Sequence, residues 1–209
     1  MNAASDYPDQ TTLSQLPLEG VCPLPHLGVI QAQGEDAATF LHNQLTNDVL
    51  LLKAHQCRLA AYCNAKGRMQ ASFVVFKRSA QEILLIGRQD LLAQTVKRLS
   101  MFVLRAKVKL TDASAEFNLL GLAGGTANAL LPEVEEDPWQ RHAVNGADVL
   151  PLSPALDQMR ALWIAPKDVP LPQGPALSAE LWQMGEVMSG IAWVEHATFE
   201  AFVPQMLNY

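Results

Sequence analysis

The chain has 209 residues, of which 49% are hydrophobic and 17% charged, and its formal net charge is −6. This length suits one large domain or two small ones, and the composition excludes a wholly disordered chain. The acidic balance, with no run of lysine or arginine longer than a pair, argues against a broad nucleic-acid-binding face. No apolar run reaches the roughly 20 residues of a membrane-spanning helix, and residues 1–15 lack a secretory pattern, so we expect a cytoplasmic protein.

The first elements predicted along the chain are an arm, a strand and a helix. Residues 1–19 are polar with little periodicity and predict a loose arm, whereas Leu27–Gln33 predicts a strand. Apolar residues at helical spacing follow, with Asp36 as the N-cap and Thr46–Asp48 as the end of the helix, because all three residues favour local bonds to the backbone.

A hairpin dominates the next part of the chain. Two apolar runs, from about Cys57 to Lys77, flank the polar tip Asn64–Gly67, which ends on a glycine where a turn needs positive φ. Ile83–Ile86 predicts the next strand, and an apolar stripe predicts a helix from about Asp90 to Phe102. Residues 105–110 alternate basic with apolar side chains and predict a half-exposed strand.

The second half predicts further strands with two helices. The expected elements are a strand over Phe117–Leu122, a short helix to Leu131, an acidic loop over Pro132–Pro138, strands over Ala147–Leu152 and Met159–Ile164, and a helix from Ser178 to Gly190. The glycines of residues 121–125 invite a phosphate-binding interpretation, but their spacing fits no phosphate motif, so a tight strand-to-helix turn is the better account. The chain is therefore predicted to be an α+β protein with antiparallel sheets and packed helices.

The cysteines and histidines predict no metal site. Cys22, Cys57 and Cys63 form no CxxC pair, so we expect reduced thiols packed as small hydrophobes. The five histidines show no metal-ligand spacing.

Four stretches follow one another along the chain: Gly34–Asp48, Asn64–Met69, Glu186–Ile191 and Phe202–Asn208. Together and in this order they resemble the folate-binding superfamily of the glycine-cleavage T-protein, and specifically its YgfZ-type branch. The resemblance implies three parts around a folate-sized opening, with two intertwined ferredoxin-like lobes: an inner lobe of about 50–112 and an outer lobe of about 20–49 plus 113–209. YgfZ-type proteins continue into a Lys-Gly-Cys-Tyr-x-Gly-Gln-Glu motif and a C-terminal β-barrel. Both are absent from this sequence, so we expect a shortened form without the barrel.

The resemblance favours an accessory protein over an enzyme. Aminomethyltransferases of the superfamily carry an aspartate just after the hairpin turn, where this chain has Ala71 and Ser72, neither of which ionises. The YgfZ-type branch implies a protein that binds tetrahydrofolate or a derivative and supports iron–sulfur enzymes or their assembly factors, with an indirect link to tRNA modification and no direct nucleic-acid or membrane partner. The alternative is a tetrahydrofolate-dependent aminomethyltransferase-like enzyme.

Seven residues are expected to bind the folate, and none to be catalytic or to bind metal: Gln44, Asn47, Asp48, Lys66, Arg68, Ser72 and Gln205. Lys66 and Arg68 either provide cations for a folate glutamyl tail or an acidic partner, or are simply the solvated, charged ends of a turn. Asn47 and Asp48 contact the ligand or cap the helix, and Gln44 points inward or to solvent. One of Trp163, Trp182 and Trp193 could stack on a pterin ring, but the sequence does not say which.

Overall fold

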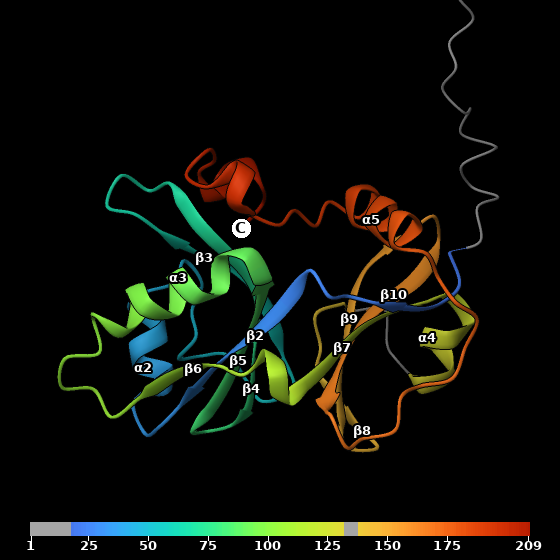
Figure 1. Ribbon diagram of the computed structural model, residues 1–209, viewed down its shortest axis with the longest axis horizontal. Coiled ribbons are helices and arrows are strands. Elements are labelled where there is room, and N and C mark those ends of the chain that lie inside the picture. Colours follow the sequence, from blue (N-terminus) through green and yellow to red (C-terminus); the bar gives the residue numbers. More distant parts are fainter. Residues whose placement is uncertain (1–17, 132–137) are drawn as a thin grey trace, which may run out of the picture.

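The computed structural model describes residues 18–131 and 138–209, which form two antiparallel sheets lying side by side (Figure 1). This confirms the predicted α+β class with antiparallel sheets. Most of the expected arm, residues 1–17, and nearly all of the expected acidic loop, residues 132–137, lie outside the described residues. Leu18, assigned to the arm, is buried in the main core, so the ordered fold begins earlier than predicted.

The first sheet has the strand order β1-β7-β10-β9-β8. Its strands are β1 (Gly20–Pro23), β7 (Phe117–Ala123), β10 (Gln158–Pro166), β9 (Ala147–Ala155) and β8 (His142–Val144). Helix α4 (Gly124–Leu130) packs on one face, while α5 (Ala179–Met188) lies at the top of this lobe in Figure 1. The middle of β10 is a continuous apolar run because both of its faces are covered.

The second sheet has the order β3-β4-β5-β2-β6. Its strands are β3 (Cys57–Cys63), β4 (Met69–Ser79), β5 (Glu82–Arg88), β2 (Leu27–Gln33) and β6 (Lys109–Asp112), and one face carries α2 (Ala37–His42) and α3 (Gln89–Ser100). The predicted hairpin is β3 and β4. Four residues of the apolar stripe of α3 are buried, namely Leu91, Leu92, Thr95 and Leu99. Val96 is partly buried, and Phe102 is 51% exposed because the helix ends at Ser100.

The expected lobe boundary at residue 49 is wrong for β2. This strand pairs with β5 along its whole length and with β6, so residues 27–33 belong to the sheet built from 50–112 rather than to the other lobe. Segment β1, only a few residues earlier, pairs with β7 in the first sheet. The chain therefore changes sheets between Pro23 and Leu27, which a pattern of local periodicity does not reveal.

Two predicted element bounds are also wrong, for one shared reason. Helix α2 ends at His42 instead of 46–48, because Leu45 forms a bridge with Tyr62 of β3. The predicted strand over 105–110 starts only at Lys109, because the backbone N–H of Lys107 donates to the Asp36 carboxylate at 2.7 Å. In both places a tertiary contact replaces the local element. Asp36 does stand at the N-cap position of α2, but it makes no side-chain bond to that helix.

The faces of the two sheets that meet share one hydrophobic core. Buried side chains of β4 and β5 pack against those of β9 and β10 there, including Val74, Phe76, Leu150 and Leu162. A buried polar link joins the sheets as well, because Arg78 Nε of β4 lies 3.1 Å from an Asp148 carboxylate oxygen of β9.

Residues 190–209, here called the C-terminal segment, cross from α5 to the β3–β4 hairpin (Figure 1). At the hairpin, Met69 N–H donates to the Phe202 carbonyl and Glu200 N–H donates to the Met69 carbonyl, each at 2.9 Å. The segment therefore lies over the region where the sheets meet. In the described parts of the chain, no helix combines the length and the apolar character that crossing a membrane requires.

Candidate functional site

A pocket of about 560 Å³ lies between α5, the start of β2, the end of β5 and the C-terminal segment. Its volume falls in the range of roughly 300–1,000 Å³ that small-molecule sites occupy. His26, Arg88, Glu186, Trp193 and Leu207 are among the residues that line it. Residues far apart in the sequence thus meet where the two sheets are bridged.

Glu186 is the buried carboxylate of this pocket. It is 7% exposed, and its Oε1 accepts hydrogen bonds from Trp193 Nε1 at 2.8 Å and from Trp182 Nε1 at 3.2 Å. Burial raises the pKa of Glu186, while the two indole donors and the guanidinium of Arg160 oppose that rise. Both indoles bond the same oxygen, and within residues 18–131 and 138–209 no hydrogen bond reaches Oε2, so this oxygen is available to a donor from a ligand.

Arg160, from β10, supports the helix that carries Glu186. Its guanidinium lies 4.2 Å from the centre of the Trp182 ring, and its Nη1 donates to the Gly185 carbonyl at 3.0 Å and to Ser189 Oγ at 2.7 Å. Burial lowers the pKa of Arg160 to about 10. A Cβ at Gly185 would lie 2.9 Å from Arg160 Nε, so only glycine lets the guanidinium reach the last turn of α5.

Arg88 and His26 form the opposite wall of the pocket. Arg88 Nη2 lies 2.9 Å from Glu195 and its Nε lies 3.7 Å from Asp90. Burial, with help from the Arg88 charge, lowers the pKa of His26, which favours neutral imidazole at pH 7. Among the described residues, His26 Nε2 and Arg88 Nε are buried without a geometrically acceptable hydrogen-bond partner. This wall therefore offers a cation and unpaired polar atoms to a ligand.

Ser72, one of the predicted folate-binding residues, holds the C-terminal segment. It is 1% exposed, and its Oγ accepts a hydrogen bond from Val194 N–H at 2.8 Å. Nearby, the Tyr209 hydroxyl donates to the Ala192 carbonyl at 2.6 Å, and burial raises the pKa of that phenol. Ala71, its neighbour, is buried in the core beneath α2 and α3.

Lys66 and Arg68 are exposed at the tip of the hairpin. Arg68 Nη1 donates to the Ala201 carbonyl at 3.0 Å, so this side chain holds the C-terminal segment against the tip. Asn64 shapes the turn, since its Oδ1 accepts from the backbone N–H groups of Lys66 and Arg68. Neither cation is among the residues that line the pocket.

Asn47 and Asp48 stabilise the loop that follows α2. Asn47 Nδ2 donates to the Leu59 carbonyl at 2.9 Å, and Asp48 Oδ1 accepts from Leu51 N–H at 2.9 Å. Gln44 is half-buried, and Gln205 is exposed next to Met206, which does line the pocket. The structure therefore disperses the seven predicted residues and gives several of them a bond to the backbone.

The sequence prediction did not include Glu186, Arg88 or His26 among the site residues, and it left the tryptophan open. Trp163 and Trp182 are buried in the core, whereas Trp193 is half-buried and lines the pocket. For Arg88 the sequence offered one signal of a functional role: this arginine is the last residue of a buried apolar strand, β5. His26 carried none, because it lies in a loop between strands of different sheets.

The glycine-rich start of α4 is already occupied by an acid. The Glu19 carboxylate accepts hydrogen bonds from the backbone N–H groups of Gly125 and Thr126 and from the Thr126 hydroxyl. A carboxylate at this helix N-terminus excludes a phosphate there and supports the tight-turn interpretation. Over residues 18–131 and 138–209, no group of three or more His, Cys, Asp or Glu side chains is placed to hold a metal ion.

The profile of the GCVT N-terminal domain family matches residues 19–152, well over half of the chain. The chain belongs to this family. The resemblance to the YgfZ-type branch of the glycine-cleavage T-protein superfamily is confirmed by curated relatives. The chain is 26% identical over 207 residues to the tRNA-modifying protein YgfZ of Colwellia psychrerythraea. The aligned region covers 94% of this chain and 62% of that protein.

Two further relatives match a similar share of this chain and of their own length. A protein of Haemophilus influenzae described as uncharacterized is 24% identical over 180 residues, which cover 86% of this chain and 56% of that one. The tRNA-modifying protein YgfZ of Blochmanniella pennsylvanica is 27% identical over 192 residues, which cover 86% and 57%. The chain thus spans about 60% of the length of these relatives.

Among solved structures, the fold is similar to that of the glycine cleavage system aminomethyltransferase T from Bartonella henselae. The TM-score is 0.61 at 16% sequence identity, over 74% of this chain and 44% of that chain. At this identity the likeness establishes the fold alone.

Proposed function

We propose that the chain binds a reduced folate, tetrahydrofolate or a derivative, in the pocket at Glu186. The observation that carries this is the buried carboxylate whose Oε1 is held by two indole N–H groups. A pterin ring presents adjacent N–H donors on its pyrimidine edge, and a carboxylate is an acceptor-only group that suits such an edge. The half-buried Trp193 offers an aromatic surface beside it.

The protein also offers groups that would interact with the glutamyl tail of a folate. This tail is anionic, and Arg88 on the pocket wall supplies a cation, although Glu195 neutralises part of that charge. Lys66 and Arg68 lie at the hairpin tip, where Arg68 Nη1 donates to the Ala201 carbonyl of the C-terminal segment. They remain our proposed contacts for a long tail.

The role we propose is that of an accessory protein rather than an aminomethyltransferase. An enzyme of this superfamily would need an ionisable acid after the hairpin turn, and here Ser72 is buried and bonded to Val194. Loss of a preorganised charge at a reacting centre typically costs on the order of 10²–10³ in rate. We propose that the bound folate serves the upkeep of iron–sulfur enzymes in the cytoplasm and, through them, tRNA modification.

Calorimetric titration with (6S)-5-formyltetrahydrofolate, a stable reduced folate, tests the binding. Glu186→Gln should weaken binding by about tenfold to a hundredfold, because a charge-assisted bond is lost. The matched control is Glu180→Gln, an exposed glutamate in the first turn of the same helix, which should bind as the parent does. The proposal fails if neither this chain nor the full-length Colwellia relative binds the folate. Folate-dependent turnover of an aminomethyl donor would instead favour the enzyme.

A further inference from the structure

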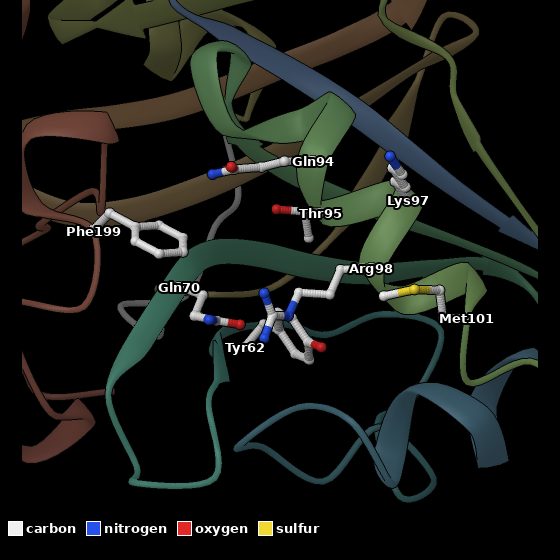
Figure 2. Close-up of a pocket in the computed structure, with 8 residues that line it drawn as sticks. All are labelled: Tyr62, Gln70, Gln94, Thr95, Lys97, Arg98, Met101 and Phe199. Atoms are coloured by element: carbon white, nitrogen blue, oxygen red, sulfur yellow. The ribbon is translucent and has the colours of Figure 1, made fainter.

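A second pocket, of about 230 Å³, lies between α3 and the tip end of the hairpin, and shares no lining residue with the first (Figure 2). Figure 2 draws the side chains that line it: Tyr62 and Gln70 of the hairpin, Gln94, Thr95, Lys97 and Arg98 of α3, Met101 directly after α3, and Phe199 of the C-terminal segment. The volume is below the range of roughly 300–1,000 Å³ for larger ligands, so it suits a single-ring compound rather than a folate.

Gln70 reaches this pocket because of an irregularity in the hairpin. Tyr62 pairs with Ala71 and Cys63 pairs with Met69, so Gln70 is the extra residue of a β-bulge. A bulge turns a side chain away from the regular alternation of a strand, and bulges are frequent beside binding sites. Here it places an amide at the base of a pocket.

The Gln70 side chain is 2% exposed and only half satisfied. Its Nε2 donates to Glu200 Oε1 at 2.6 Å, which orients the amide, while its Oε1 is buried with no hydrogen-bond partner in the described part of the chain. Figure 2 shows this oxygen turned toward Tyr62 and Arg98. An unpaired buried acceptor is costly, so its presence in a pocket indicates that a donor from a ligand belongs there.

The charge at the pocket comes from α3. Lys97 and Arg98 are exposed lining residues, and neither forms an ion pair with any residue of 18–131 or 138–209. The nearby Glu200 is not a lining residue; hydrogen bonds from Gln70 and Asn64 lower its pKa, and the charge of Arg98 lowers it further. Among the described residues Lys97 and Arg98 still lack an ion-pair partner in direct contact, so the two cations favour an anion at the rim.

Phe199, Tyr62 and Met101 supply the apolar surface. Figure 2 shows Phe199 at one end and Met101 at the other, with Tyr62 between them. Aromatic rings and a thioether are favourable neighbours for a flat ring. We propose that this pocket binds a small planar organic anion that carries an N–H or O–H donor, with the anion at Arg98 and Lys97 and the donor at Gln70 Oε1.

Anthranilate is a suitable probe, because it combines a carboxylate, an adjacent amino group and a fluorescent ring. Its own fluorescence reports binding to the intact chain. Benzoate lacks the donor, and 2-aminobenzamide lacks the charge. We expect anthranilate to bind about tenfold more tightly than either, since each comparison removes one hydrogen-bonded interaction. This comparison tests the role of Gln70 Oε1 without a substitution in the buried hairpin.

Arg98→Ala should weaken anthranilate binding by about tenfold, whereas Arg105→Ala, which removes an exposed arginine outside the pocket, should leave it unchanged. Gln70→Leu should make the affinities for anthranilate and benzoate equal. Absence of saturable anthranilate binding at millimolar concentration, or equal binding to the parent and to Arg98→Ala, would overturn the proposal. Loss of anthranilate binding in Glu186→Gln but not in Arg98→Ala would also overturn it, by placing the probe in the first pocket. Reduced-folate binding should be unaffected by Arg98→Ala, so the two proposals fail separately.

Discussion

The hydroxyl of Ser72 accepts a hydrogen bond from the backbone N–H of Val194 at 2.8 Å, and both residues are buried. This contact joins the middle of β4 to a segment more than a hundred residues later, where the C-terminal segment crosses between the sheets. The Ser72 hydroxyl therefore helps to close the fold by holding the C-terminal segment.

Ser72→Ala should therefore lower the free energy of unfolding by about 1–3 kcal/mol, because the Val194 N–H is left buried without a partner. Urea unfolding followed by circular dichroism measures the change. Ser100→Ala, at the exposed end of α3, is the matched control and should stay within about 0.5 kcal/mol of the parent. Equal stability of the two variants would show that the hydroxyl is not needed to hold the segment.

The buried link between the sheets gives a second prediction. Asp148 is 2% exposed and contacts the guanidinium groups of Arg78 and Arg141. Asp148→Ala should destabilise the chain by about 3–5 kcal/mol, because Arg141 loses its carboxylate partner and Arg78 keeps only its ion pair with Glu82. Asp168→Ala, an exposed aspartate in the turn after β10, should change little. A thermal or urea unfolding midpoint unchanged by Asp148→Ala would contradict the importance of this link.

Glu186 predicts a pH dependence of stability. Burial raises the pKa of this carboxyl in the folded chain above its unfolded value, so the folded state favours the protonated form. Stability contributed by Glu186 therefore falls as pH rises from the unfolded pKa through the folded pKa. Glu186→Gln keeps an oxygen for the indole donors but does not ionise.

We accordingly expect Glu186→Gln to gain stability relative to the parent at pH 8 compared with pH 4, as measured by urea unfolding at the two values. Glu180→Gln on the same helix provides the reference for the loss of an exposed charge. A difference between the Glu186 variant and the parent that does not change with pH would contradict the raised pKa.

The three cysteines should differ in reactivity. Burial raises the pKa of Cys57 to about 12 and also raises that of Cys22, and both thiols lie in the core between the sheets. Burial also raises the pKa of Cys63, but this thiol is only partly buried, near the hairpin tip, so a reagent can reach it. With a thiol reagent at pH 8, Cys63 should react first and Cys57 last, because the thiolate is the reactive form. A Cys63→Ser variant should lose the fast phase. A fast phase that survives in this variant would contradict the assignment.

Local pattern was sufficient for much of the fold. The hairpin followed from two apolar runs around Asn64–Gly67, and the helix capped by Ser178 followed from its apolar spacing, with Ser178 Oγ accepting from Leu181 N–H as a cap should. These elements depend on residues within a few positions of each other. The neighbouring sequence is therefore enough to predict these elements.

The arrangement of those elements, and with it both pockets, arose from contacts between distant residues. Strand β2 joined the second sheet through β5 and β6, and α2 stopped early because Leu45 met Tyr62. The pocket at Glu186 needs Arg88 from β5, and the bulge at Gln70 appears only when β3 and β4 are paired in register. The periodicity of one segment does not indicate which distant segment it will pair with or pack against. The sequence alone therefore determined the elements and the family, while tertiary pairing determined which side chains line a site and which, like Ser72, are used to close the fold.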